Sequence, residues 1–242
     1  MNLELRKAGL PDHRARGDRP SSWEGGVPRR PFWLLAFLAT LATAGLLGLD
    51  RLVADFVRAQ EPDAFRSLAV AISWIGGSGI YPLTAALLLA WSCRVRLDRR
   101  LWRACLWLLA AEGLCALVVR LLKMGFGRLR PEQLLAGHFE FFQLKSKCHS
   151  FPSGHTADAA AVAAVLWFIY PRLRPLYVVW VVLMAVARIG AAQHFVADAA
   201  TGAALGVLCA LAVGRYLDAM VRWIERRLFL QSLQRGGTQW YP

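Results

Sequence analysis

Three short clusters of polar residues each lie at one end of a long apolar stretch, although they are far apart in the sequence. In the first cluster, six residues separate a lysine from an Arg-Pro pair. In the third, five residues separate an arginine from a histidine, and three more separate that histidine from an aspartate. The clusters are Lys123 with Arg130 and Pro131, the tetrapeptide Pro152-Ser153-Gly154-His155, and Arg188 with His194 and Asp198.

The basic members of these clusters suit the binding of a phosphoryl group. Lys123 supplies a point charge, and Arg130 and Arg188 supply forked donors that match phosphate oxygens. Ser153 and Gly154 stand where a helix is expected to begin, so that free backbone N–H groups and the helix dipole face an anion. Glycine also lets the backbone approach a ligand closely. These residues predict a phosphate site.

The two histidines suit transfer of that group. His194 and Asp198 are four residues apart, which places them on one face of a helix start, where Asp198 can accept from one imidazole nitrogen and leave the other free to attack. His155 is then available to protonate a leaving oxygen. The sequence has no carboxylate cluster suited to Mg²⁺, so we expect no metal and no cofactor, with the cations and N–H groups stabilising the transition state.

Each residue also has a simpler interpretation when it is taken alone. Lys123 and Arg130 could be interfacial side chains that reach toward water, and either histidine could be hydrogen-bonded within a loop. Arg188 is harder to explain in this way, since it closes an apolar run without an acidic neighbour in the sequence. The joint arrangement favours one assembled site.

The composition indicates a membrane protein. Of the 242 residues, 57% are hydrophobic and 19% charged, mean hydropathy is +0.39, and the net charge is +13. These values exclude a disordered chain, a collagen and a disulfide-dense module. The basic residues lie between apolar runs, which argues against nucleic-acid binding. A soluble helical bundle is the alternative to membrane helices. The positions of the five cysteines predict neither an intramolecular disulfide nor a zinc site.

We predict an all-α, polytopic integral membrane protein with six transmembrane helices in residues 32–213. Residues 1–31 are expected to be a disordered, basic, cytoplasmic leader, residues 50–66 an amphipathic surface segment, and residues 214–242 an amphipathic tail on the inner surface. The predicted spans are 32–49, 80–93, 101–122, 156–170, 176–189 and 195–213.

Arginine-rich segments predict the orientation, because positively charged loops resist translocation. They occur in the leader, around residues 94–103 and 171–174, and in the tail, so both termini are expected to be cytoplasmic. The three polar clusters then meet at the outer face. The fourth and fifth spans are short, which would place this site slightly below the bilayer surface.

The motifs Lys-x6-Arg-Pro, Pro-Ser-Gly-His and Arg-x5-His-x3-Asp resemble the three-part signature of the type 2 phosphatidic acid phosphatase (PAP2) superfamily, which includes the vanadium haloperoxidases. The resemblance covers residues 32–213. One position departs from the pattern: the serine usual before the third-motif arginine is Ala187 here, which removes one hydrogen bond to the phosphate or to the loop.

The resemblance implies a role for each motif residue and independence from metals. His194 would be the nucleophile that forms a phosphohistidine, Asp198 would orient it, and His155 would be the general acid. The phosphate would be bound by Lys123, Arg130, Ser153, Gly154 and Arg188.

The resulting hypothesis is a lipid phosphatase at the outer face of a bacterial inner membrane, with a bell-shaped dependence of rate on pH. Candidate substrates by resemblance are undecaprenyl pyrophosphate, phosphatidic acid, phosphatidylglycerophosphate and the phosphates of lipid A. A lipid phosphotransferase and a non-catalytic anion-binding membrane protein are the alternatives. The sequence chooses neither the head group nor the oligomeric state.

Two further features carry open alternatives. Glu112 lies near the middle of the third span, where an ionised carboxylate is costly, and could pair with another helix, stay protonated or line a cavity. The loop at residues 132–151 mixes phenylalanines with Lys145 and Lys147, and could be a mouth for an amphiphile or an ordinary interfacial loop.

Overall fold

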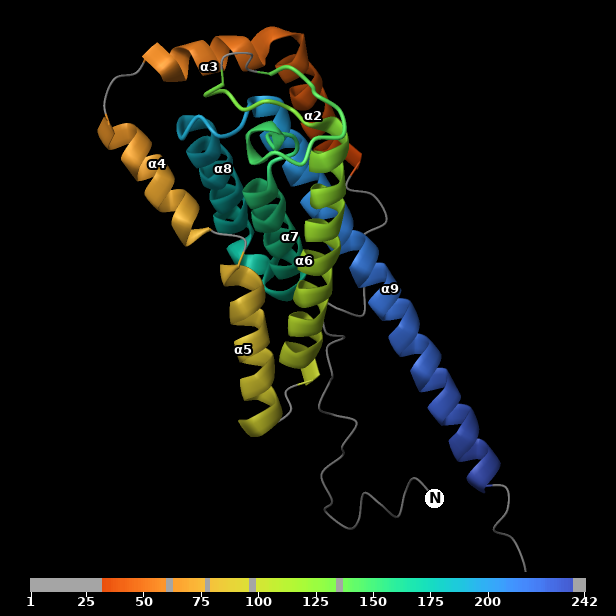
Figure 1. Cartoon of the computed structure of the whole chain (residues 1–242). Helices are drawn as coiled ribbons and strands as arrows, with labels where there is room; N and C mark the ends of the chain where they lie inside the picture. Colours follow the sequence, from red (N-terminus) through yellow and green to blue (C-terminus); the bar gives the residue numbers. More distant parts are fainter. Residues whose placement is uncertain (1–31, 60–62, 77–78, 96–98, 134–136, 237–242) are drawn as a thin grey trace, which may run out of the picture.

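The fold is helical throughout the part of the chain that the structure, a computed structural model, describes: residues 32–59, 63–76, 79–95, 99–133 and 137–236. No strand occurs in these ranges, where Arg128 and Phe139 form an isolated bridge. The prediction of an all-α fold is confirmed. The helices are α2 (Phe32–Ala44), the π-helical η1 (Gly45–Leu49), α3 (Asp50–Ala59), α4 (Asp63–Ile75), α5 (Ile80–Val95), α6 (Arg99–Phe126), α7 (Gly154–Ile169), α8 (Arg174–Gly190) and α9 (Val196–Gly236), with short 3-10 turns at Ser146–Cys148 and Pro171–Leu173 (Figure 1).

Five stretches in the described residues are long and apolar enough to cross a membrane, whereas we predicted six spans. The remaining apolar helix, α7, has 16 residues and extends about 24 Å at 1.5 Å per residue, which is short for a bilayer core. The five are Phe32–Ala59, Phe65–Trp91, Ala104–Phe126, Pro171–Gly190 and Val196–Leu217.

The second span differs most from its predicted bounds of 80–93. It starts earlier and is built from two helices, α4 and α5, while the amphipathic segment predicted at 50–66 is divided between α3 and α4. Gly76 follows α4, and a Cβ there would overlap the Sδ and Cε atoms of Met184 on α8. Glycine thus lets the end of α4 pack closely against α8, which hydropathy alone does not indicate.

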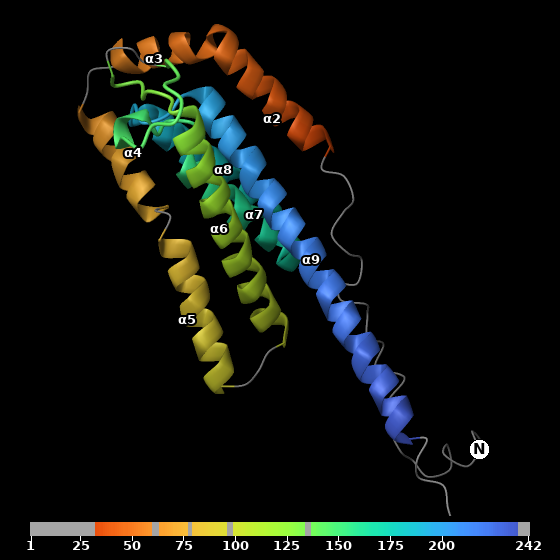
Figure 2. The same cartoon turned by 45° about the vertical axis from the view of Figure 1, so that its right-hand side comes forward.

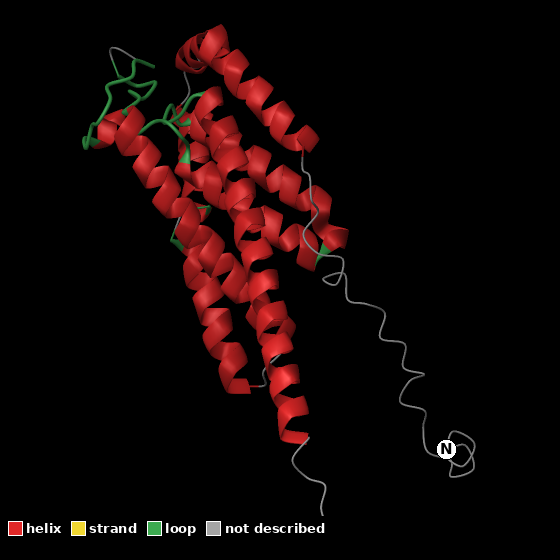
Figure 3. Cartoon of the chain, turned by 90° about the vertical axis from the view of Figure 1, so that its right-hand side faces the viewer, coloured by secondary structure: helices red, strands yellow, loops and turns green. Residues whose placement is uncertain are grey.

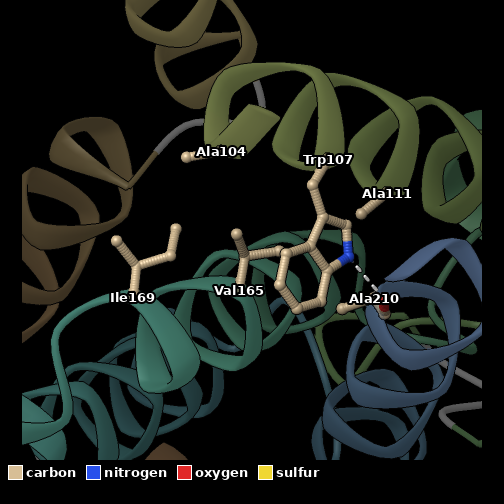
Figure 4. Packing of buried hydrophobic residues seen from close by; sticks show 6 residues of the cluster. All are labelled: Ala104, Trp107, Ala111, Val165, Ile169 and Ala210. Carbon is tan, nitrogen blue, oxygen red and sulfur yellow. Dashed lines mark hydrogen bonds between the residues drawn. The ribbon is translucent and has the colours of Figure 1, made fainter. Parts of the chain in front are cut away.

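Helix α7 forms the centre of the bundle and contacts α6, α8 and α9 (Figure 2). Between them lies a core in which Trp107 of α6 lies beside Val165 of α7 and Ala210 of α9, and Ile169 of α7 extends the same cluster (Figure 4). The Trp107 indole N–H donates to the carbonyl of Ala210 at 2.7 Å, so the one polar atom of this buried ring is satisfied. Glu112 is also buried, and its Oε1 has no hydrogen-bond partner.

The polar loops gather at one end of the bundle, where α6 and α8 end and α7 and α9 begin (Figure 3). Helix α3 lies across this end (Figure 1). Its inner face includes Asp50 and Ala54, which are buried, whereas Leu52 and Phe56 are exposed. An amphipathic surface helix is therefore present, and it covers the end of the bundle where the predicted site lies.

At the other end of the chain, helix α9 continues without interruption from Val196 to Gly236, so residues 214–236 are continuous with the last apolar helix. The position of this tail on the inner surface stays a prediction. The predicted leader, residues 1–31, lies outside the described residues.

Helices α7 and α9 approach closely because two glycines of α9 face α7. A Cβ at Gly202 would overlap the carbonyl oxygen of Ser153, and one at Gly206 would overlap that of Ala157. This Gly-x3-Gly pair therefore serves packing within the chain.

Replacing Gly206 with alanine is expected to destabilise the protein by about 1–3 kcal/mol, because the methyl group forces two backbones apart. The measurement is thermal unfolding in detergent. Gly113→Ala is the matched control: no atom lies within 4 Å of its added Cβ, so it should leave the melting temperature unchanged or raise it slightly. Equal melting temperatures for Gly206→Ala and Gly113→Ala would contradict the packing role.

Candidate active site

His194 lies in the short turn between α8 and α9, with 2% of its surface exposed. Its Nδ1 is 2.6 Å from the backbone carbonyl of Ser150. A carbonyl oxygen can only accept, so Nδ1 carries the proton and Nε2 keeps its lone pair. This is the tautomer that a nucleophile attacking through Nε2 requires.

Asp198, in the first turn of α9, acts on His194 less directly than expected. Its Oδ2 is 3.8 Å from Nδ1 of His194, which is an electrostatic contact and not a hydrogen bond. The same oxygen accepts from the Ser150 hydroxyl at 2.5 Å and from the Phe195 N–H at 2.8 Å. Ser150 therefore joins the two residues, since its hydroxyl binds the carboxylate and its carbonyl holds the imidazole.

Asp50 and Arg128 complete this buried network, and the sequence analysis identified neither of them. Arg128 donates from one terminal nitrogen to Oδ1 of Asp198 at 2.6 Å and from the other to Oδ2 of Asp50 at 2.8 Å. Its guanidinium lies over the Phe195 ring, 4.2 Å from the centroid. Asp50 begins α3, and its Oδ1 accepts from the Ala197 N–H at 3.0 Å. Both Asp50 and Arg128 are almost fully buried.

The three predicted phosphate-binding cations come together near His194. Lys123, Arg130 and Arg188 are close enough to repel one another electrostatically. Asp158 and Asp198 act on Lys123 electrostatically, whereas the Nε atoms of both arginines are buried without a hydrogen-bond partner. Arg130 donates from a terminal nitrogen to the Gln193 side chain. A group of cations with buried, unpaired Nε atoms is what an anionic ligand would bind.

The second motif meets these cations at the start of α7. The Nζ of Lys123 lies 3.7 Å from the position of a Cβ on Gly154, so the first and second motifs are in contact. His155 interacts electrostatically with Arg188, His194 and Lys123. Ser153 is the exception: its hydroxyl is fully buried and shares a hydrogen bond of 2.9 Å with Thr156, while its N–H donates to the Asp198 carbonyl at 3.0 Å. Its predicted phosphate contact stays a prediction.

Burial sets the protonation state of His194. Removal from water lowers the pKa of His194 from 6.5 to about 4, and the charges of Lys123 and Arg188 act in the same direction, while Asp198 opposes them. The imidazole is therefore neutral at pH 7. In the described part of the chain, no group of three or more His, Cys, Asp or Glu residues could hold a metal ion.

The loop before the second motif has one part that packs against the end of α6 and another that is exposed. Phe126, Phe139 and Phe151 pack ring against ring, with centroids 5.3–6.3 Å apart. Phe142 and Leu144 are exposed, as are Lys145 and Lys147. This mixture of exposed apolar and basic groups is compatible with either predicted role, a mouth for an amphiphile or an interfacial loop.

The sequence profile of the PAP2 superfamily matches residues 100–222, slightly more than half of the chain. Two proteins named lipid A 1-phosphatase, from Rhizobium johnstonii and Rhizobium etli, are 32% and 31% identical to this chain over 93 residues, 37% of its length. That match spans about two fifths of the length of these curated relatives, 38% and 40%.

Two crystal structures have a similar fold. One is a transmembrane PAP2 type phosphatidylglycerolphosphate phosphatase from Bacillus subtilis, with a TM-score of 0.59 and 24% identity, covering 77% of this chain and 95% of that one. The other is LpxE of Aquifex aeolicus, with a TM-score of 0.53 and 26% identity, covering 69% of this chain and 93% of that one. The matched residues include all three motifs, and the chain belongs to the PAP2 superfamily.

Proposed function

We propose that this protein is a metal-independent membrane lipid phosphatase that forms a phosphohistidine at His194. The observation that carries the proposal is the position of the neutral imidazole. Its Nδ1 is held by a carbonyl, which leaves Nε2 free, and Lys123 and Arg188 lie close enough to act on the ring. A nucleophile with a fixed tautomer next to an anion site is the arrangement that in-line phosphoryl transfer needs.

In the first step, Nε2 of His194 attacks phosphorus and the bond to the lipid oxygen breaks. His155 gives its proton to that oxygen, so the lipid leaves as an alcohol or a shorter phosphate. The ring of His194 retains its Nδ1 proton and becomes cationic. Lys123, Arg130 and Arg188 neutralise the charge that develops on the phosphoryl oxygens.

In the second step, water attacks the phosphohistidine. His155, now neutral, accepts a proton from this water, and the bond between phosphorus and Nε2 breaks. Inorganic phosphate leaves and both histidines return to their starting states. If a second lipid or a sugar hydroxyl took the place of water, the same residues would make a phosphotransferase.

The proposed substrate is a lipid phosphate whose acyl chains stay in the bilayer of a bacterial inner membrane, and the proposed site faces outward. The shortness of α7 supports this, because it puts the start of that helix near or slightly below the bilayer surface. Lipid A carrying a 1-phosphate is the first candidate, given the names of the curated relatives. Phosphatidylglycerophosphate, phosphatidic acid and undecaprenyl pyrophosphate are the others.

The proposal predicts phosphate release by the purified protein from at least one of these lipids with EDTA present. His194→Ala should abolish release, because no other group can form the covalent intermediate. His138→Ala, in which an exposed loop histidine is removed, is the matched control and should keep wild-type activity. Transfer of phosphate to an added acceptor without release would favour the phosphotransferase, and phosphate binding without turnover would favour the anion-binding protein.

The buried His194 also predicts where activity is lost in acid. The imidazole attacks only when neutral, so kcat/KM should persist as pH falls through 6.5 and decline near pH 4, where the free enzyme takes up the proton. Burial and the nearby charges of Arg188, His194 and Lys123 lower the pKa of His155 to about 3 in the ligand-free protein. His155 therefore acts as the acid only once a bound phosphate offsets those cations, and the alkaline limb of the bell is expected in kcat. Intrinsic fluorescence should show that the protein is still folded at the lowest pH used. A decline centred at pH 6.5 would mean that the nucleophile is not desolvated.

A further inference from the structure

The network behind His194 joins segments that are remote in the sequence, and it holds two carboxylates for a single guanidinium. Asp50 comes from the start of α3, Arg128 from the loop after α6, and Asp198 from the first turn of α9. All three are at most 4% exposed. The Arg128 guanidinium is 2.8 Å from Asp50 and 2.6 Å from Asp198.

These contacts fix the charge of the network. Two ionised carboxylates and one guanidinium leave a formal charge of −1, buried where solvent screens it poorly. Arg128 alone would pair fully with Asp198 and neutralise it. Asp50 occupies the second terminal nitrogen of Arg128, so the two carboxylates share one guanidinium. The negative charge of Asp198 is therefore only partly neutralised and still acts on the Ser150 hydroxyl and the His194 ring.

The charge matters because the reaction makes His194 positive. Attack by Nε2 leaves Nδ1 protonated, so the phosphohistidine ring is a cation in a site that already contains several cations. A net negative charge on the Nδ1 side of the ring stabilises this cation more than it stabilises the neutral ring of the resting enzyme. Asp50 and His194 line the same small pocket beneath α3, which places Asp50 near enough to contribute.

We propose that Asp50 and Arg128 are positioning residues which set the charge of the network behind His194, so that it stabilises the cationic phosphohistidine. This inference rests on the proposed function. Neither residue touches the phosphate, and both act through Asp198 and Ser150. The proposal assigns α3, which carries no motif residue, a part in the chemistry.

The charged groups around His194 fall into two sets of opposite sign. Lys123 and Arg188 oppose a positive charge on the ring, whereas Asp198, 3.8 Å from Nδ1, favours it. The charged and titratable groups are Lys123 from α6, Arg128 and Arg130 from the following loop, His155 from α7, Arg188 from α8, Asp198 from α9 and Asp50 from α3.

The test changes the charge of the network in both directions. Asp50→Asn brings it from −1 to 0 and should lower kcat by about 10- to 100-fold, as loss of an outer hydrogen-bonding partner does, with KM changed less than about twofold. Arg128→Gln brings it to −2 and should move the acidic limb of kcat/KM upward by about one pH unit, because the added negative charge favours protonated His194.

The double variant Asp50→Asn/Arg128→Gln separates charge from structure. It again leaves −1 on the network, so its acidic limb should return to the wild-type position and its kcat should exceed that of Asp50→Asn. If the pair served only to hold the fold, the two losses would add and the double variant would be the worst of the three. A double variant with a lower kcat than Asp50→Asn overturns the proposal.

Asp55→Asn and Arg51→Gln are the matched controls, since both residues are exposed on α3, and both variants should behave as wild type. If Arg128→Gln does not fold, the test is a comparison of kcat and KM between Asp50→Asn and Asp55→Asn. A lower kcat with a similar KM for Asp50→Asn alone supports the proposal. If the wild type releases phosphate and Asp50→Asn has an unchanged kcat, this inference is overturned and the proposed function is not. Absence of release from the wild type overturns the proposed function and this inference with it.

Discussion

The buried carboxylate of Asp198 is the point at which the segments of the active site are joined. Its side chain accepts hydrogen bonds from Arg128, Ser150 and Phe195, and its backbone carbonyl accepts from the Ser153 N–H. A carboxylate removed from water costs several kcal/mol unless such donors replace its hydration. The loop after α6, the segment before α7 and the start of α9 are therefore kept together, because separating any of them would leave that charge unsatisfied.

Close packing of the helices is what allows these hydrogen bonds to form. Ser153 reaches the Asp198 carbonyl because Gly202 lets α9 approach the backbone of α7 without overlap. Gly45 has a similar role beside Asp50, since a Cβ there would lie 2.7 Å from Oδ1 of Asp50 and 2.8 Å from the Cβ of Ala197. The site thus depends on glycines that take no part in chemistry but determine whether the polar groups can meet.

The three motifs and the helical membrane fold could be predicted from the sequence, because the motif spacings are short and apolar runs report helix lengths. The expected position of His194 and Asp198 on one helix face was wrong, since His194 lies in the turn before α9. Asp50 and Arg128 could not be predicted. They are 78 residues apart, and each resembles an ordinary charge at the end of an apolar helix until the fold brings both to Asp198. In the sequence, Arg128 lies two residues before the motif residue Arg130, and Ser150 lies two residues before the motif residue Pro152. This closeness to the motifs was the only indication that either residue belongs to the site. The start of α5 at Ile80 matches the predicted start of the second span, whereas the contact of Gly76 with α8 could not be predicted, because it depends on the packing of a remote helix.

The resulting arrangement is polarised about the imidazole of His194. Asp198, which shares Arg128 with Asp50, lies 3.8 Å from Nδ1, and the cations Lys123 and Arg188 act on the same ring with the opposite sign. In the proposed mechanism, the cations favour the neutral ring that attacks, whereas the carboxylates favour the cation that attack produces. Either set alone would be less useful: cations alone would raise the energy of the intermediate, and carboxylates alone would protonate the nucleophile before it could react. The burial that keeps His194 neutral at pH 7 also strengthens both fields, because little water remains to screen them.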